Sequence, residues 1–251
     1  MSEVKKAPVN IPPELYSEFT NGYPLFYWYM DNAGASAANI TWPNEYIQDY
    51  VNRFTYENIN NNSSGQEPYI NGALFVKTAC EKYQSYIYNK HVAVIGSETP
   101  WIEAILLNSG AKSITTVEYN VPHCDHGIIK SISYDTFTTQ KDLYDCVVSY
   151  SSIEHSGLGR YGDPLEPNGD IITMKHIHSS LKMDSILLLG IPVGHDALVW
   201  NVHRIYGKQR LAKLFQGFKE IEWFGDTREE MEKRQPHWDA LQPIIALKPL
   251  W

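Results

Sequence analysis

The stretch from residue 91 to residue 120 constrains the fold of this chain more than any other part of the sequence. Residues 92–95 form a short β-branched apolar run, which is typical of a strand buried on both faces, and Gly96 follows directly. An apolar helical segment then leads to a second β-branched run at residues 114–117, which ends in Glu118. The order strand, glycine turn, helix, strand and acidic residue predicts one βαβ unit of a parallel sheet.

This unit has the layout of a site for a nucleoside-containing cofactor. Free N–H groups at the glycine turn and the helix N-terminus can bind an anionic part of a ligand, and the Glu118 carboxylate can accept two hydrogen bonds from a ribose diol. A dinucleotide-binding turn has the pattern Gly-x-Gly-x-x-Gly, whereas Gly96 stands alone here and is followed by Ser97 and Glu98. Glu98 would repel a pyrophosphate but would tolerate the ammonium group of an amino-acid tail. The sequence therefore favours S-adenosylmethionine over NAD as the cofactor.

Further apolar runs alternate with helical segments along the rest of the chain. We expect strands at residues 128–132, 145–149, 185–191, 218–224 and 243–247. We expect helices at residues 169–181 and 206–215, and a short charged helix with a capping box between Thr227 and Glu230. The alternation of strands with helices predicts an α/β fold with a mostly parallel sheet.

The N-terminal part of the chain has a different character. Residues 1–13 have the composition of a flexible leader, and residues 23–29 form a dense aromatic cluster. We expect residues 14–56 to form helices and a loop that cover or flank the site, with Thr41 or Asn44 capping one of the helices.

A long helix is predicted over residues 67–88, directly before the first strand of the βαβ unit. A chain of 251 residues fits one domain with an extension. We therefore divide it into an N-terminal extension and lid, residues 1–66, and a cofactor-binding domain, residues 67–251.

Composition excludes several classes of function. The chain has 21 Lys and Arg residues against 29 Asp and Glu residues, a net charge of −8, which argues against a general nucleic-acid binder. Its three cysteines, Cys80, Cys124 and Cys146, show no paired spacing and indicate a reducing compartment. No apolar run approaches the roughly 20 residues of a membrane span, and no secretory leader opens the chain. We therefore expect a cytoplasmic protein; the sequence leaves its oligomeric state open.

Residues 67–250 resemble the class I S-adenosylmethionine-dependent methyltransferases, through the turn at Gly96, the acid at Glu118 and the strand at residues 145–149. The resemblance implies a Rossmann-like α/β sandwich with a mostly parallel seven-stranded sheet whose last strand is antiparallel. Three segments, GSETPWIEAILL, SYSSIEHSGLGRYGDP and PVGHDALVWNVHRIYG, are similar to a nematode and bacterial family of unknown function with a methyltransferase-like fold. The cofactor-binding residues that the resemblance implies are Gly96, Ser97, Glu98, Trp101, Glu118, Tyr119, Asp135 and Ser149.

The run SSIEH, which starts at Ser151, is the sharpest candidate for catalysis. It is similar to the Glu-x-x-Glu-His run with which metal-dependent O-methyltransferases of vicinal diols or catechols bind a divalent cation, although Ser151 replaces the first carboxylate. Glu154 and His155 would then bind Mg²⁺ or Mn²⁺ together with His195 or His203. Alternatively, His155 acts directly as a general base, or both residues only stabilise the loop.

Other polar residues follow the fourth and fifth strands. Arg160, Asp163 and Asp170 lie in the insertion after the fourth strand, where substrate loops usually lie, although each residue type is also common in surface ion pairs. His195 is a third catalytic candidate because it lies at the rim where open α/β sheets bind ligands, and His203 is grouped with the acceptor-binding residues Arg160 and Asp163.

These residues predict an O-methyltransferase that acts on a hydroxyl group of a small polyhydroxylated acceptor, most simply a sugar or a glycan end. Aromatic residues of the N-terminal extension would stack on a sugar ring. A methyltransferase-like protein that binds a ligand or partner without catalysis is the alternative. An NAD-dependent enzyme is disfavoured by the single glycine of the turn.

Overall fold

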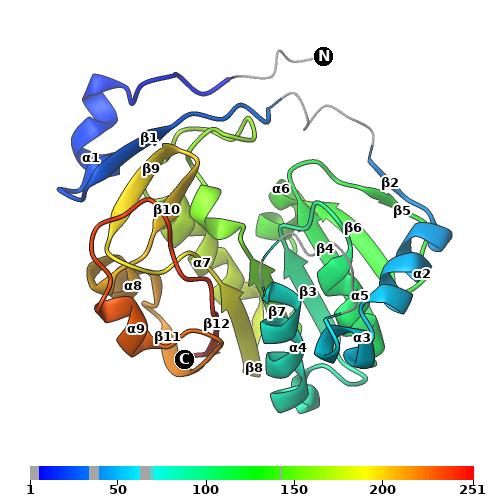
Figure 1. Ribbon diagram of the computed structural model, residues 1–251. Coiled ribbons are helices and arrows are strands. Elements are labelled where there is room, and N and C mark those ends of the chain that lie inside the picture. The colour runs from blue at the N-terminus through cyan, green and yellow to red at the C-terminus, as the bar shows by residue number, and fades with distance from the viewer. Residues whose placement is uncertain (1–5, 34–39, 63–68, 70, 142) are drawn as a thin grey trace.

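A seven-stranded sheet forms the centre of the computed structural model, which describes residues 6–33, 40–62, 69, 71–141 and 143–251 (Figure 1). Its strands are β3 (His91–Ile95), β4 (Ser113–Glu118), β6 (Ile129–Ser133), β7 (Tyr144–Tyr150), β8 (Leu181–Gly190), β11 (Phe218–Phe224) and β12 (Ile244–Pro249). They follow the order β11-β12-β8-β7-β3-β4-β6. The pairs from β8 to β6 are parallel, and β12 is antiparallel to both of its neighbours. The predicted Rossmann-like sheet, mostly parallel with an antiparallel last strand, is confirmed.

Helices cover both faces of this sheet (Figure 1). From α4 onwards they are α4 (Gly72–Lys82), α5 (Trp101–Asn108), α6 (Tyr134–Thr139), α7 (Gly169–Ser180), α8 (Lys208–Leu214) and α9 (Arg228–Glu232). Val92 and Val94 of β3 belong to the core under α4 and α5, whereas Ala93 and Ile95 belong to the core under α6, α7 and α8. Because successive strand residues point to opposite faces, a strand covered on both sides has a continuous apolar run.

The elements expected after residue 91 are present. The strand predicted at residues 185–191 is longer than expected, because β8 begins at Leu181. The predicted capping box of α9 is formed: Glu230 N donates to Thr227 Oγ1 at 3.2 Å, and Thr227 N donates to a Glu230 carboxylate oxygen at 2.7 Å.

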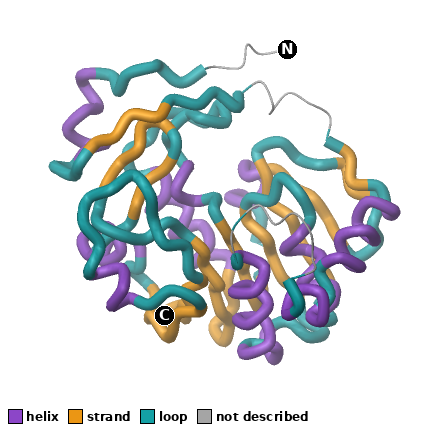
Figure 2. The backbone as a smooth tube through the Cα atoms, viewed as in Figure 1, coloured by secondary structure: helices purple, strands orange, loops and turns teal. Residues whose placement is uncertain are grey.

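The aromatic cluster near the N-terminus forms a strand, β1 (Leu25–Trp28), where we expected helices and a loop. It pairs in parallel with β9 (Ala197–Asn201), which pairs antiparallel with β10 (His203–Ile205), and β2 (Thr41–Trp42) pairs in parallel with β5 (His123–Cys124). The expectation is wrong at β1 because pairing with a distant strand, rather than local pattern, fixes its conformation. Figure 2 shows this small β1-β9-β10 sheet apart from the central sheet.

Short helices do form in the N-terminal segment: α1 (Tyr16–Thr20), α2 (Asn44–Arg53) and α3 (Tyr56–Asn60). The expected side-chain cap of α2 is wrong, since Pro43 occupies the N-cap position and no side chain caps this helix. The long helix predicted at residues 67–88 is shorter: α4 ends at Lys82 and a 3-10 turn, Gln84–Tyr86, follows. Its predicted start and the predicted domain boundary at residue 66 lie outside the described residues.

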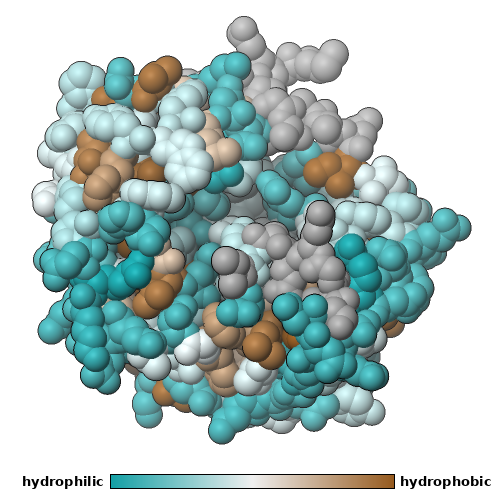
Figure 3. Space-filling model, viewed as in Figure 1, coloured by the Kyte–Doolittle hydropathy of each residue, from teal (hydrophilic) through white to brown (hydrophobic). Residues whose placement is uncertain are grey.

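The surface of the molecule is mixed in character. In Figure 3, hydrophobic residues are scattered over a mostly hydrophilic face. None of the described helices has the length and apolar character that crossing a bilayer requires.

Candidate functional site

A cavity of about 960 Å³ lies at the carboxyl ends of β3, β4 and β7, and Trp28 of β1 also borders it. Of the predicted site residues, its wall contains Gly96, Ser97, Glu98, Trp101, Glu118, Tyr119, Glu154, His155, Arg160, Asp163 and His203. Small-molecule sites usually measure roughly 300–1,000 Å³. This cavity therefore has room for a nucleoside cofactor and a small second molecule.

The turn after β3 is packed directly against the loop after β7. Gly96 has a φ of +78°, and a Cβ at this position would lie 2.0 Å from Ser152 Oγ. Gly96 N also donates to Val117 O of β4 at 3.0 Å. Glycine is therefore required here both for the backbone conformation and for the close approach of the two loops.

Ser97 joins the carboxyl group of Glu118, which is half-buried in the cavity wall, to that of Glu103, which is completely buried. Its backbone N–H donates to Glu118, and its Oγ lies 2.8 Å from Glu103 Oε2, while Thr116 Oγ1 donates to Glu103 Oε1 at 2.7 Å. Burial raises the pKa of both Glu103 and Glu118 to about 7, although these hydrogen bonds oppose the rise. Glu103 was not among the predicted site residues, but a single carboxylate inside the apolar run of α5 is a sequence signal that could have identified it.

Glu154 lies in the 3-10 turn Ile153–His155 that follows β7 and is completely buried. Ser151 Oγ donates to its Oε1 at 2.9 Å, and its Oε2 makes no hydrogen bond to any residue that the structure describes. Burial raises the pKa of Glu154 to about 7. The carboxyl group is thus poised to exchange a proton near neutral pH.

The hydrogen bonds of His155 define its tautomer. Its Nδ1 lies 2.5 Å from Val202 O, and because a carbonyl oxygen only accepts, the ring donates through Nδ1. The lone pair is therefore on Nε2, which lies 3.7 Å from Glu154 Oε1. Burial, reinforced by the charge of Arg160, lowers the pKa of His155 to about 3, so the ring is neutral at neutral pH.

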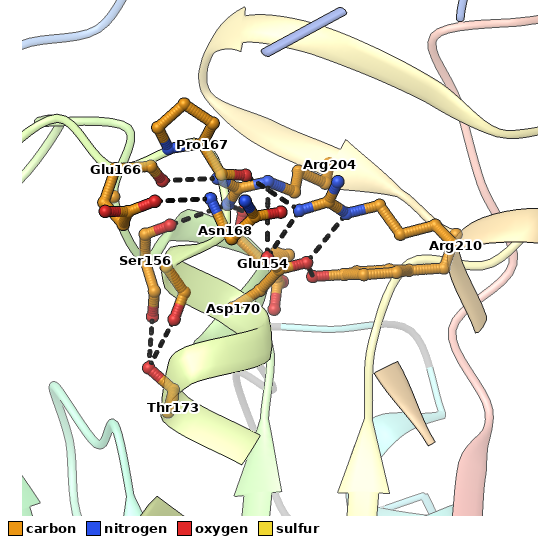
Figure 4. Close-up of polar contacts among 12 residues, drawn as sticks. Glu154, Ser156, Glu166, Pro167, Asn168, Asp170, Thr173, Arg204 and Arg210 are labelled. Carbon is orange, nitrogen blue, oxygen red and sulfur yellow. Dashed lines mark hydrogen bonds and ion pairs between the residues drawn. The ribbon is translucent and has the colours of Figure 1, made fainter. Parts of the chain in front are cut away.

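A buried ionic network holds this turn in place (Figure 4). Arg204 donates to the carbonyl oxygens of Glu154 at 3.2 Å and Ser156 at 2.7 Å. Asp170 accepts from Arg210 at 2.5 and 2.9 Å, and its Oδ1 lies 3.8 Å from Arg204 Nε. The surface ion pair considered for Asp170 is thus wrong: the residue is fully buried and helps to position the Glu154 turn.

Arg160 and His203 also border the cavity, and the charge of Arg160 acts on both Glu154 and His155. Arg160 Nε donates to Asn32 Oδ1 at 3.0 Å, and Asn32 N donates back to Arg160 O at 2.9 Å. Burial and the charge of Arg160 lower the pKa of His203 to about 4, and His203 Nε2 makes no hydrogen bond to a described residue. Asp163 instead organises its own loop, because its carboxylate accepts from three backbone N–H groups of residues 157–161.

Three predicted site residues lie outside the cavity wall. Asp135 is exposed in the first turn of α6, and Ser149 Oγ donates to Ile95 O at 3.0 Å within the sheet. His195 is exposed, and its Nδ1 lies 3.1 Å from Asp196 O. The neighbouring Asp196 accepts hydrogen bonds from three backbone N–H groups at the start of α8, and its carboxylate therefore stabilises the N-terminal end of this helix.

Of the two histidines considered as a further metal ligand, His195 lies outside the cavity wall, whereas His203 borders the cavity together with Glu154 and His155. Across the described ranges, no group of three or more His, Cys, Asp or Glu side chains is arranged to hold a metal ion. Trp28 belongs to the aromatic cluster of the segment that we expected to cover or flank the site, and it does border the cavity. Asn32 and Trp238, which also border it, were not predicted, and nothing in their local sequence marks them.

Comparisons with known proteins give a family and a fold. A family model described as a Caenorhabditis protein of unknown function, DUF268, matches residues 89–240. No curated protein matches the chain. Among solved structures, the [4+2]-cyclase SpnF is similar with a TM-score of 0.51 at 14% identity, over 74% of this chain and 84% of that chain.

Two methyltransferase structures align as well. An S-adenosylmethionine-dependent methyltransferase from Clostridium acetobutylicum has a TM-score of 0.48 at 8% identity, over 70% of this chain and 90% of that chain. The mitomycin 7-O-methyltransferase MmcR has a TM-score of 0.46 at 12% identity, over 71% of this chain and 55% of that chain. At such identities the likeness concerns the fold, and the strand order agrees with the predicted methyltransferase-like fold.

Proposed function

The chain belongs to the DUF268 family and has a methyltransferase-like fold, and from this premise we propose that it is an S-adenosylmethionine-dependent O-methyltransferase. The acceptor is a small polyhydroxylated molecule, such as a sugar or a glycan end, and one of its hydroxyl groups receives the methyl group. The observation that carries the proposal is that the Gly96 turn and the Glu118 carboxylate border one cavity. Nucleoside-containing cofactors commonly bind at this position, at the carboxyl ends of the two strands of a βαβ unit.

The residues of this wall fit S-adenosylmethionine. Glu118 lies where its carboxylate would accept hydrogen bonds from the ribose hydroxyls, and the exposed carboxylate of Glu98 suits the ammonium group of an amino-acid tail. Gly96 has no side chain and packs closely against Ser152, so no side chain of this turn residue projects toward the cofactor. When bound, the cofactor supplies a methyl group on a positively charged sulfur, which is already activated for attack by a hydroxyl oxygen.

Glu154 is the group best suited to accept the proton of the attacking hydroxyl. A base works best when its pKa lies near the operating pH, and the pKa of Glu154 is about 7. His155 is a weak base, because its pKa is about 3, but its Nε2 can accept a hydrogen bond and orient the acceptor. We therefore assign proton removal to Glu154 Oε2 and orientation to His155, in place of the base role first considered for His155.

The N-terminal segment supplies the cover in this proposal. Trp28, Met30 and Trp42 border the cavity and come from the part of the chain that we called an extension and lid. Excluding water and fixing the hydroxyl in line with the methyl group provide most of the rate gain in such a transfer.

Calorimetry with S-adenosylhomocysteine and with NAD tests the cofactor. We expect S-adenosylhomocysteine to bind and NAD to leave no signal. Transfer of a tritiated methyl group to a panel of sugars, phenols and small RNAs then tests the reaction, with a sugar as the expected acceptor. Binding without transfer to any panel member would favour the non-catalytic alternative, and binding of NAD alone would refute the proposal.

A further inference from the structure

Arg160 forms no direct ion pair with a described carboxylate, although its charge acts on the buried Glu154 carboxyl group and opposes the rise of its pKa. It is the single Lys or Arg side chain among the described residues of the cavity wall. Its Nε donates to Asn32 Oδ1, its guanidinium group lies 4.9 Å from the centre of the Tyr161 ring, and no described carboxylate lies within 4.0 Å of its nitrogens. Its two terminal nitrogens make no hydrogen bond to a described residue.

The carboxyl groups nearest to this end of the cavity have other partners. Asp163 accepts hydrogen bonds from three backbone N–H groups, and Asp239 forms ion pairs with Arg234, at 3.1 Å, and with His237. Glu154 is neutral for part of the time near pH 7, since burial raises its pKa to about 7. The two other acids of the cavity wall are Glu98, which is exposed to solvent on the turn after β3, and Glu118, which accepts hydrogen bonds from Ser97 N and Tyr119 N.

The neighbouring imidazoles add no positive charge. The pKa values of His155 and His203 are both lowered, to about 3 and about 4, so both rings are neutral at neutral pH. They can therefore hydrogen-bond hydroxyl groups, while the guanidinium of Arg160 is the group that can bind an anion, through two parallel N–H donors.

Two indole rings complete this end of the cavity. Trp28 and Trp238 both border it, with their ring centroids 5.9 Å apart in an edge-to-face arrangement. About half of each side chain is exposed, 50% for Trp28 and 51% for Trp238, so their faces are open to a ligand. Indole rings pack well against the C–H faces of a sugar.

We propose that Arg160 binds a carboxylate or phosphate group of the methyl acceptor, so that the acceptor is a small anionic sugar rather than a neutral one. This inference rests on the proposed methyl transfer. The reciprocal hydrogen bonds between Asn32 and Arg160 hold the guanidinium in place and tie the acceptor end of the cavity to the N-terminal segment. An acid at one end of the sugar would direct a defined hydroxyl toward Glu154.

The test uses the full chain saturated with S-adenosylhomocysteine and follows tryptophan fluorescence during titration with three probes. The probes are D-glucuronate, D-glucose 6-phosphate and uncharged D-glucose. We expect at least one of the two anions to bind about tenfold or more tightly than glucose, because charge-assisted bidentate hydrogen bonds are strong. Preference for glucuronate would identify a carboxylate acceptor, and preference for glucose 6-phosphate a phosphorylated one.

Variants locate the anion. Arg160→Gln should bind the preferred anion no better than glucose, and Arg160→Lys, which keeps the charge but loses the fork, should retain part of the preference. Arg228→Gln is the matched control, because Arg228 forms a surface ion pair with Glu220 outside the cavity wall. Equal affinity of the wild type for all three probes, or an unchanged anion preference in Arg160→Gln, would overturn the inference.

A second measurement separates this role from recognition of the cofactor's own carboxylate. Affinity for S-adenosylhomocysteine and for 5′-methylthioadenosine, which lacks the amino-acid tail, is compared in the wild type and Arg160→Gln. Unchanged affinities are expected. Selective weakening of S-adenosylhomocysteine would show that Arg160 binds the cofactor tail and would refute the inference. If S-adenosylhomocysteine fails to bind the wild type, the proposed function fails, and the anion titration on the free protein still decides whether Arg160 binds anions.

Discussion

The two walls of the cavity are built in different ways. The wall that holds Gly96 and Glu118 comes from one βαβ unit, and its hydrogen bonds join residues close in sequence, such as Ser97 and Glu103, which are six positions apart. The opposite wall is assembled from distant segments. Asn32 and Arg160 are 128 positions apart, and Met30 N bonds to Asn201 Oδ1 across 171 positions.

This difference suggests a division of labour. The fold itself specifies a wall that is made by a single local unit. Such a wall suits the cofactor, which stays the same while the acceptor differs. A wall made by the N-terminal segment and the loop after β7 can change with those segments while the sheet stays the same, and it suits the acceptor. Variants of the first wall should therefore affect binding of the cofactor, and variants of the second wall should affect binding of the acceptor.

The largest effect is expected at Gly96, in the local wall. Gly96→Ala should abolish measurable binding of S-adenosylhomocysteine, because the new Cβ would lie 2.0 Å from Ser152 Oγ at a backbone φ of +78°. Adding Ser152→Gly should partly restore binding, since the nearest remaining atom, Ser152 Cα, lies 3.6 Å away. Calorimetry measures both variants.

Gly22→Ala is the matched control for this pair. Gly22 has a similar φ of +77°, but a Cβ there meets nothing within 4 Å. It should therefore lose stability without losing the cofactor. Normal binding by Gly96→Ala would place the cofactor elsewhere in the molecule.

Glu154, between the two walls, should give the next largest effect. Glu154→Gln should lower kcat by about 10²–10⁴-fold, the usual contribution of a general base. In the wild type kcat should rise with pH through about 7, as the carboxyl group loses its proton, and this limb should disappear in the variant. A His155→Ala variant that loses the same limb while Glu154→Gln keeps it would return the base role to His155.

Assays with a chelator test whether Glu154 and His155 bind a metal ion. Glu154 Oε1 already accepts from Ser151, and His155 Nδ1 is bonded to Val202 O, so we expect a chelator to leave the rate unchanged. Loss of activity that Mg²⁺ or Mn²⁺ restores, together with weaker metal binding in His155→Ala, would support a metal site instead.

Glu118→Ala should weaken S-adenosylhomocysteine binding by about 100-fold or more. Two hydrogen bonds to a charged acceptor are lost, each contributing about 1.5–3 kcal/mol. Because ribose hydroxyls bind the ionised carboxylate better and the pKa of Glu118 is about 7, wild-type affinity should fall as the pH drops below 7, and the variant should lose this dependence. Calorimetry at pH 6 and pH 8 measures both the loss of affinity and its pH dependence. If a folded Glu118→Ala variant bound S-adenosylhomocysteine as tightly as the wild type, the ribose contact would be ruled out.

The same contrast explains what the sequence could predict. The Gly96 turn and Glu118 depend on patterns within about 30 residues, where hydrophobic periodicity and turn chemistry act directly. The arrangement of the sheet came instead from the resemblance to the methyltransferase fold, because it joins distant segments: β7 pairs with β3, and β12 pairs with β8. The capping box at Thr227 is local in the same sense and was predicted correctly. The aromatic residues of β1 were expected to form helices and a loop, because their strand exists only through pairing with β9.

Besides long-range strand pairing, the sequence does not show how deeply each candidate side chain is buried. His155 was weighed as a base from the ordinary imidazole pKa, and only the structure shows a buried ring whose pKa is lowered to about 3. His195 carries equally suggestive chemistry, but its side chain is exposed and outside the cavity wall. Residue type and spacing identified candidates, and the environment of each candidate decided its role.

The smallest expected effect concerns Glu103, which lies beneath the local wall and contacts no ligand in our proposal. Its pKa is raised from 4.5 to about 7 by burial. Between these two pH values the folded protein holds a proton that the unfolded chain has lost, so this group lowers the free energy of unfolding as the pH rises. Each pKa unit corresponds to about 1.4 kcal/mol, which sets a ceiling of about 3 kcal/mol on this cost at pH 8.

Glu103→Gln should therefore stabilise the protein at pH 8 by about 1–2 kcal/mol and have little effect at pH 5. The amide can accept from Thr116 Oγ1 and donate to Ser97 Oγ, which can in turn donate to Thr99 O, 2.9 Å away. Urea unfolding at both pH values measures the difference, with Glu57→Gln on the exposed surface of α3 as the control. Because the variant keeps the position of Ser97, binding of S-adenosylhomocysteine should be unchanged. A variant that is destabilised at pH 8 would mean that an ionised Glu103 supports the turn, and the local wall would then depend on charge as well as on shape.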